Sequence, residues 1–202
     1  MADSNITKQA MAAAFKELLR EHSFDKISVS DICERCHMNR KSFYYHFKDK
    51  FDLANWIFDT EFMEVTRQNA IDVEADTANI ENRWNDLKIV CEYFYENRTF
   101  YYRLLRTDGQ NSLPEHFRGF IHPILRRRIP LIIGELEISP MVYDFIVDGV
   151  AGAFERWLQD KNCATAEEFL DGIKGVLQVM VIGLGKRVRN NPEWFHNLYE
   201  TE

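Results

Sequence analysis

The chain has 202 residues, of which 46% are hydrophobic and 13% aromatic, a composition that excludes a disordered protein and allows a substantial core. It has no apolar run of about 18 residues, and its N-terminus lacks the basic and apolar regions of a signal peptide, so we expect a cytoplasmic protein with no membrane partner. The net charge is −7, but residues 1–50 carry nine Lys and Arg against seven Asp and Glu, a net +2 that leaves −9 for the remainder. Cationic groups suited to phosphate therefore concentrate at the front of the chain.

The predicted elements are all helices, because the long stretches between few prolines and glycines show helical and not strand periodicity. The first covers about residues 7–22, with Ala10, Ala14 and Leu18 on its apolar face. The second starts at Ser28, which can form a capping box with Asp31. Its apolar positions, 29, 32, 33 and 36, have the spacing of one helical face.

A short third helix is predicted after a tight turn at His37–Met38. Asn39 can cap a helix over Arg40–Phe47, and Lys48–Asp49 is a further break. Asp49 can cap a long helix that ends near residue 70. Two short helices joined by a turn of three or four residues form a helix-turn-helix unit.

The rest of the chain alternates helices with polar breaks. Residues 72–81 read as an acidic loop, helices are expected over about 82–95 and 100–106, and 108–112 form a turn. Another helix runs from Pro114 to about residue 128, where Arg126, Arg127 and Arg128 are interpreted as a solvated helix end rather than a second nucleic-acid patch. Two long apolar helices cover about 141–159 and 165–189.

The third helix carries the functional signal. Phe43 and Phe47, four residues apart, can anchor it to the rest of the domain. The other side chains can donate hydrogen bonds to phosphates or bases, as a helix in the major groove must do; they are Arg40, Lys41, Ser42, Tyr44, Tyr45 and His46.

Residues 27–53 resemble the DNA-binding signature of the TetR/AcrR family of transcriptional regulators. The resemblance rests on Tyr44-x-His46-Phe47, followed by Lys50 and Leu53, and extends over about residues 6–56. Segments 96–111 and 149–158 are similar to a subset that regulates dihydroxyacetone kinase operons. The resemblance implies an all-α fold, with a three-helix DNA-binding helix-turn-helix domain over 1–50 and a helical effector-binding and dimerisation domain over 51–202.

The resemblance also assigns roles by position. Tyr44, His46 and Lys50 would contact backbone phosphates of operator DNA, and Ser28 and Ser30 could meet phosphate at the start of the second helix. The groove would be faced by Arg40, Lys41, Ser42 and Tyr45. The expected function is that of a repressor that binds a palindromic operator. The alternative is that of a co-activator controlled by a protein partner.

The turn of the helix-turn-helix departs from the family pattern. The family has an Ala-Gly pair where this chain has Cys36-His37, and the glycine allows a left-handed backbone conformation. Histidine tolerates that region better than most residues, although less easily than glycine. We expect a turn that is somewhat strained or shifted.

Metal, redox and enzyme functions find little support. Cys33-x-x-Cys36-His37 lacks a second pair of ligands for zinc, and both cysteines fall on the apolar face of their helix, so we interpret them as reduced core thiols and expect no metal or cofactor. No G-x-S-x-G, P-loop, dinucleotide-binding or H-E-x-x-H motif occurs, so we expect no enzyme. A protein-interaction module that has lost DNA binding is disfavoured by the intact donor set at 40–50.

The last two helices predict a homodimer built as a four-helix bundle. The predicted interface residues are Ile146, Val150, Phe154, Trp157, Phe169, Ile173, Val176, Met180 and Leu184. Gly149, Gly152, Gly172 and Gly175 could allow close approach of the backbones there.

Aromatic residues between about 82 and 157 suggest a cavity for an unknown small-molecule effector. The candidate lining residues are Trp84, Tyr102, Phe117 and His122. The alternative is a solid core, with control by a protein partner on the outer surface.

Overall fold

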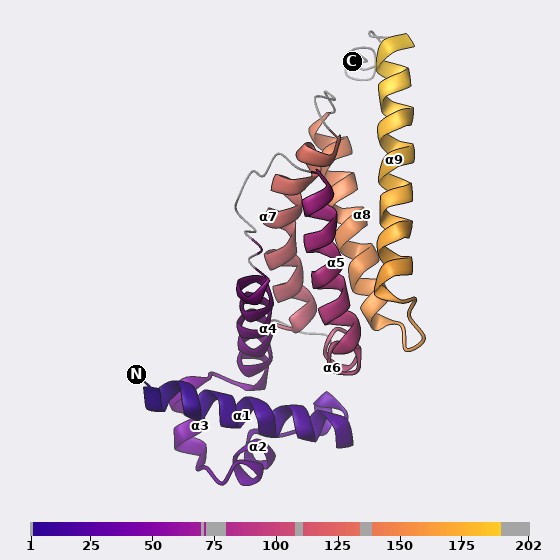
Figure 1. Ribbon diagram of the computed structural model, residues 1–202. Coiled ribbons are helices and arrows are strands. Elements are labelled where there is room, and N and C mark those ends of the chain that lie inside the picture. Colours follow the sequence, from indigo (N-terminus) through magenta and orange to yellow (C-terminus); the bar gives the residue numbers. More distant parts are fainter. Residues whose placement is uncertain (1, 70, 72–79, 108–110, 134–138, 191–202) are drawn as a thin grey trace, which may run out of the picture.

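The computed structural model describes residues 2–69, 71, 80–107, 111–133 and 139–190, and in these ranges the chain is helical, as predicted (Figure 1). The helices are α1 (Ala2–Glu21), η1 (Phe24–Lys26, a 3-10 turn), α2 (Val29–Arg35), α3 (Arg40–His46), α4 (Lys50–Gln68), α5 (Ile80–Glu96), α6 (Arg98–Leu104), α7 (Leu113–Ile133), α8 (Pro140–Gln159) and α9 (Ala166–Asn190). Helices α1 to α3 form a head at one end, and α5 to α9 form a larger body, with α4 between them (Figure 1). No described helix has an apolar stretch long enough to cross a membrane.

The three predicted helix caps are all present. The Ser28 hydroxyl accepts from the Asp31 amide at 3.2 Å, and the Asp31 carboxylate accepts from the Ser28 amide at 2.7 Å, which completes the capping box. The Asn39 side chain accepts from the Ser42 amide at 2.8 Å. Asp49 accepts from the first amides of α4 at 2.8 and 2.9 Å. Each cap satisfies amides that the first turn of a helix leaves without partners, so the chain begins these helices where the sequence predicts.

Some helix ends differ from the prediction. Helix α1 begins at Ala2 and not near residue 7, and α6 lies two residues earlier at both ends. The interpretation of Arg126–Arg128 as a helix end is wrong, because α7 continues to Ile133. Arginine is a good helix former, and α7 packs lengthwise against α8, where Arg126 meets Asp144. Packing against α8 thus stabilises α7 beyond residue 128, where local sequence signals predicted its end.

Helix α4 joins the head to the body through aromatic contacts at both of its ends. In the head, the ring of Phe24 lies 4.8 Å from Phe51, and Phe47 lies 5.6 Å from Trp56. In the body, Phe120 of α7 packs edge-on against α4 at 4.8–5.1 Å. One continuous buried cluster therefore runs from the head into the body.

The body is packed around aromatic rings. Phe94 of α5 contacts Tyr101 at 4.8 Å and Phe154 at 5.1 Å, and Phe117 stacks on Phe154 at 5.4 Å. At the start of α9, Phe169 lies parallel to Trp157, with 4.3 Å between the ring centres. These ring contacts stabilise the packing of the body helices in addition to the free energy gained from the buried apolar area.

Candidate nucleic-acid interface

The turn between α2 and α3 adopts the left-handed conformation that the sequence predicts. His37 has a φ of 55°, and its side chain is exposed. Its amide donates to the Glu34 carbonyl at 3.2 Å, and the Met38 amide donates to the Cys33 carbonyl at 2.8 Å. This pair of hydrogen bonds is the Schellman ending of a helix, which explains why the family prefers glycine at this position. Histidine occupies a position that is strained for a residue with a Cβ.

Helix α3 separates an anchored face from an open one. Phe43 and Phe47 are buried, at 0% and 3% exposure, and hold the helix to the head. Tyr45 is 82% exposed and Tyr44 51% exposed, and Arg40 and Lys41 are exposed beside them. In Figure 1 the helix lies on the side of the head that faces away from the body. The structure therefore brings most of the predicted donor set together on one accessible surface.

The donors on α3 make few contacts within the protein. A guanidinium nitrogen of Arg40 lies 3.5 Å from the Tyr44 hydroxyl, which accepts its hydrogen bond. Ser42 and His46 are half-buried, and the His46 ring packs edge-on against Tyr45 at 4.9 Å. Among the described residues, neither Arg40 nor Lys41 forms an ion pair with a carboxylate, so both charges can be offered to a polyanion.

The two serines near the start of α2 differ in availability. Ser28 is exposed, but its hydroxyl donates to Asp31 at 2.8 Å within the capping box. Ser30 is half-buried. The Ser28 amide and hydroxyl together hold the pKa of the Asp31 carboxyl below its usual range. Contact of Ser28 and Ser30 with phosphate stays a prediction.

Lys50 occupies a position that the sequence does not reveal. Its ammonium donates to the carbonyls of Phe24 and Ile27 at 2.8 and 2.9 Å and lies 4.3 Å from the centre of the Phe24 ring. Burial lowers the pKa of this ammonium. Its partners lie more than twenty positions earlier in the chain, and no local sequence signal could have found them. Lys50 fastens the segment before α2 to the start of α4, and its contact with phosphate stays a prediction.

The cysteines of the head belong to its core. Cys33 is 2% exposed, and Cys36 is half-buried with its thiol 3.6 Å from the Cys33 carbonyl. Burial raises the pKa of both thiols. In the described part of the chain, no group of three or more His, Cys, Asp or Glu side chains is arranged to hold a metal ion.

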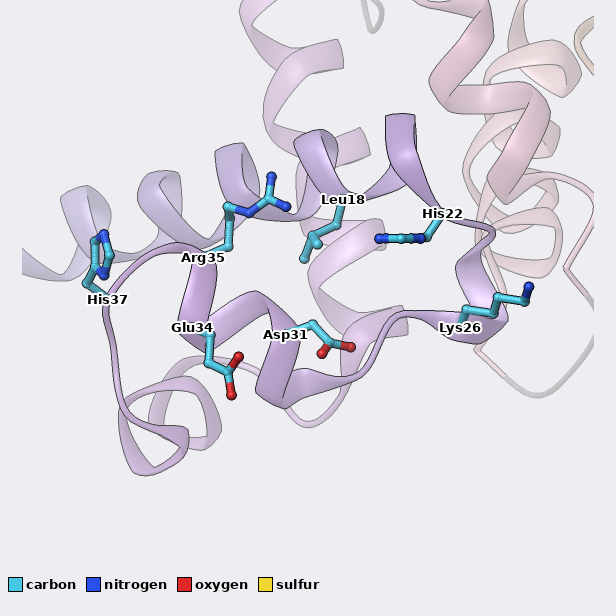
Figure 2. A pocket seen from close by; sticks show the side chains of 7 residues that line it. All are labelled: Leu18, His22, Lys26, Asp31, Glu34, Arg35 and His37. Carbon is cyan, nitrogen blue, oxygen red and sulfur yellow. The ribbon is translucent and has the colours of Figure 1, made fainter.

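A groove on the head lies between α1 and α2, and Figure 2 shows the side chains that line it. Arg35 of α2 crosses it and pairs with Glu21 at 2.7 Å and Glu17 at 3.3 Å on α1. Its hydrogen bond lowers the pKa of Glu21. The Arg35 charge is thus neutralised within the head, unlike the cations of α3, and it sets the angle of α2 against α1. Local sequence patterns could not predict this cross-link, because the two glutamates lie fourteen and eighteen positions before Arg35.

The predicted dimer residues fall into two groups. Ile146, Phe154 and Trp157 are buried inside the protomer, whereas Val176 is 59% exposed. Val150, Phe169, Ile173 and Met180 are half-buried, and the Leu184 side chain lies outside the described residues. The sequence missed other apolar side chains that α8 and α9 expose, which are Met141, Phe145 and Val179 at 70%, 70% and 71%.

The four candidate effector residues lie in different environments. Phe117 is fully buried in the aromatic core, and Lys174 of α9 lies over the Trp84 ring at 5.1 Å. His122 of α7 lies 3.5 Å from Asp148 of α8. Tyr102 alone lines a described cleft, at the junction of head and body. The structure does not gather these four side chains around one site, and an effector cavity formed by them stays a prediction.

A chain of polar side chains links the head to the body through α4. Lys16 of α1 pairs with Glu61 of α4, and Glu61 accepts from the Tyr93 hydroxyl of α5 at 2.7 Å. Tyr93 shares a hydrogen bond of 2.9 Å with Tyr101 of α6. Burial raises the pKa of both tyrosines, so both hydroxyls stay protonated at neutral pH. Four helices are therefore joined by hydrogen bonds that a change in the angle of α4 must break or bend.

Comparisons with known proteins agree with this division into head and body. Residues 11–56 match the family described as bacterial regulatory proteins, tetR family. Residues 82–178 match a family described as transcriptional regulator C-terminal region.

One curated relative is the HTH-type dhaKLM operon transcriptional activator DhaS of Lactococcus lactis subsp. lactis, 32% identical over 117 residues. That match covers 58% of this chain and 57% of the relative, so the chain spans little more than half of the relative it matches.

Solved structures share the fold. A dihydroxyacetone kinase operon activator, DhaS, matches with a TM-score of 0.58 at 24% identity, over 87% of this chain and 96% of that one. A TetR transcriptional regulator from Streptococcus agalactiae matches with a TM-score of 0.64 at 22% identity, over the same shares of the two chains. FadR from Thermus thermophilus, solved with lauroyl-CoA, matches with a TM-score of 0.53 at 17% identity, over 85% and 93%.

Proposed function

Because the chain belongs to the TetR family of bacterial regulatory proteins, a family without enzymatic activity, we propose that it is a DNA-binding transcriptional regulator that reads an operator with α3. One observation carries the proposal. The side chains of α3 that anchor the helix are buried, whereas four of its donors, Arg40, Lys41, Tyr44 and Tyr45, are exposed and without carboxylate partners among the described residues. Such a helix presents Arg40, Lys41 and Tyr45 to the major groove and Tyr44 to the backbone.

The test is selection of bound fragments from genomic DNA, followed by fluorescence anisotropy on the selected operator. Tyr44→Ala should weaken all sequences alike and leave the salt dependence unchanged, because phosphate contacts carry no sequence information and the tyrosine hydroxyl is uncharged. Arg40→Ala and Lys41→Ala should change sequence preference by about 1–3 kcal/mol for each base contact. Arg67→Ala is the matched control, since Arg67 is an exposed cation on α4 paired with Glu64. Unchanged affinity in all three α3 variants contradicts the proposal.

The regulator acts as a homodimer on a palindromic operator, in which each α3 enters one half-site. Support comes from α9, where exposed residues that are small or apolar recur every three or four positions: Gly172, Gly175, Val176, Val179 and Gly183. Apart from adjacent residues and the nearby backbone of α9 itself, no atom in the described part of the chain lies within 4 Å of a Cβ built on Gly172, Gly175 or Gly183. A second copy of α8 and α9 fits this face, because identical apolar faces bury each other across a two-fold axis and small residues permit close approach.

The direction of regulation is activation. The curated relative that is 32% identical over 117 residues carries the name of transcriptional activator, of a dhaKLM operon. Repression, the expectation from the sequence, is the alternative outcome of the test. A promoter–reporter fusion to the selected operator distinguishes them, since deletion of the regulator lowers expression in the first case and raises it in the second.

An effector controls the regulator through the angle of the head. Two recognition helices must lie about 34–36 Å apart to enter successive major grooves. The polar chain Lys16–Glu61–Tyr93–Tyr101 and the rings around α4 tie that angle to the packing of the body. A ligand that prefers one arrangement a hundredfold supplies about 2.7 kcal/mol of coupling.

A further inference from the structure

A cleft at the junction of head and body carries positive charge that its surroundings do not neutralise. It has a volume of about 580 Å³ and lies between η1 of the head, α6, and the connection from α8 to α9. Its lining includes four cations, Arg98, Arg103, Arg106 and Lys161, and two carboxylates, those of Asp25 and Asp160. The cleft therefore has a surplus of two positive charges in a protein whose net charge is −7.

Among the described residues, the three arginines of the cleft donate hydrogen bonds to neutral oxygens only. Arg98 donates to the Tyr95 carbonyl at 2.9 Å, Arg103 to the His22 carbonyl at 2.8 Å, and Arg106 to the Tyr102 hydroxyl at 2.7 Å. In the described ranges, none of the four cations forms an ion pair. Elsewhere in the same ranges arginines do pair with carboxylates, as Arg35, Arg67 and Arg118 show.

We propose that this cleft binds a small anion that carries a phosphate group. A phosphate brings close to two negative charges and three strong acceptor oxygens, which matches the charge surplus and the several donors. Arginine guanidinium groups bind phosphate with paired hydrogen bonds, and the hydroxyls of Ser23, Thr99 and Tyr102 on the same lining add donors. The volume lies within the range of about 300–1,000 Å³ usual for small-ligand sites.

Position in the fold gives the cleft a regulatory role, which rests on the proposed function. Its lining comes from both head and body, and Arg103 already reaches across the junction to the carbonyls at the end of α1. A phosphate held between Arg106, Lys161 and Ser23 adds a second bridge beside this one. The anion is thus an effector that fixes the angle of the head rather than one enclosed in the aromatic core. Figure 1 shows α1 lying between α6 and α2, so the cleft is separate from the surface that α3 offers to DNA.

The test is isothermal calorimetry on the full chain without DNA, at constant ionic strength set with chloride. Pyrophosphate and inorganic phosphate are the probes, and malonate is a dicarboxylate whose charge is close to that of inorganic phosphate. We expect saturable binding of pyrophosphate, one per chain. Arg106→Gln and Lys161→Gln should each weaken it about tenfold, as loss of one charge-assisted contact does. Both side chains are exposed, so neither substitution disturbs the core. Arg67→Gln removes one positive charge elsewhere and should leave the affinity unchanged.

Three results overturn the assignment. They are the absence of saturable binding by either phosphate probe, equal affinity in the wild type and both cleft variants, and binding of malonate as tightly as inorganic phosphate. DNA affinity is measured separately by anisotropy. If the chain binds pyrophosphate but no operator, the anion site is supported and the proposed function is contradicted. If it binds an operator but no pyrophosphate, only the anion site is contradicted.

Discussion

The head and the body each leave one helical face uncovered, and the two faces have opposite chemistry. On the head, α3 exposes Tyr45 at 82% beside Arg40 and Lys41. On the body, α8 and α9 expose Phe145 at 70% and Val179 at 71%. A polar face is stable in water and can bind and release a charged ligand. Removing an apolar face from water gains about 25 cal/mol of free energy per Å², so an exposed apolar face favours a permanently bound partner.

The surface of the head is complete in a single chain, whereas one side of the body is not. The head has the anchors of α3 buried and the starts of α2 and α3 capped, and every side chain that α3 exposes carries a polar group. The body has an aromatic interior but an apolar exterior on one side.

Val179→Glu should dissociate the dimer and leave the protomer folded. A two-fold interface would bury two unpaired carboxylates, at a cost of about 4 kcal/mol or more, which corresponds to about a thousandfold in the dimer dissociation constant. Sedimentation velocity at micromolar concentration measures it. Val179 is 71% exposed in the protomer, so circular dichroism should be unchanged.

Gln178→Glu is the matched control, because it adds the same charge to the neighbouring exposed position, about 100° around the helix from Val179. Dimers that survive Val179→Glu would contradict the proposed interface. Ile173 is a poorer probe, since it is half-buried against the cluster of Ile146 and Leu177, and a charge there would unfold the body.

Phe43→Ala should destabilise the head by about 3–5 kcal/mol, the usual cost of removing a buried phenyl ring. Phe43 is fully buried and contacts the rings of Tyr44 and Phe47 at 5.6 and 5.7 Å. Urea denaturation followed by circular dichroism measures the loss. Tyr45→Ala, at a position 82% exposed, should change stability by no more than about 0.5 kcal/mol and yet weaken operator binding. Equal effects of the two variants on stability would remove the distinction between anchored and open faces of α3.

Local signals predicted the head more completely than the body. The caps at Ser28, Asn39 and Asp49 and the left-handed residue His37 depend on neighbours within a few positions, and the structure confirms each. The exposed face of α3 followed from the spacing of Phe43 and Phe47.

Contacts across the chain could not be predicted. Helical periodicity identifies an apolar face but not the neighbour that covers it, so Phe154 and Trp157 were assigned to the dimer although the protomer itself buries them. The same limit hid the pairing of Lys50 with carbonyls of the segment before α2, and of Glu61 with Tyr93. Aromatic content predicted a cavity lined by Trp84, Tyr102, Phe117 and His122, and the structure places those four side chains in separate environments.

Lys50→Met should cost about 1–3 kcal/mol of stability, because it leaves the Ile27 carbonyl without its donor and the Phe24 carbonyl with the Ile27 amide alone, while retaining an apolar stem. Urea denaturation again measures it, and Lys48→Met, at an exposed neighbouring position, is the control. If Lys50→Met weakens operator binding at unchanged stability, then Lys50 acts through phosphate and not by fastening the head.

The smallest effect concerns thiols and compares the opening of head and body directly. Cys33 of the head and Cys91 of the body are buried at 2% and 1% exposure, while Cys36 and Cys163 are half-buried. Burial raises the pKa of Cys91 to about 12, so almost none of it is thiolate at neutral pH. A disulfide reagent should therefore modify Cys36 and Cys163 first, and Cys33 and Cys91 only when their region opens.

Operator DNA stabilises the head that binds it, so it should slow modification of Cys33 more than that of Cys91. Mass spectrometry of digested samples resolves the four sites. Equal slowing at Cys33 and Cys91 would mean that head and body open as one unit, which the continuous cluster through α4 permits. Slower modification of Cys33 alone would show that the head opens independently of the body. A head that changes its angle to release DNA requires such independence.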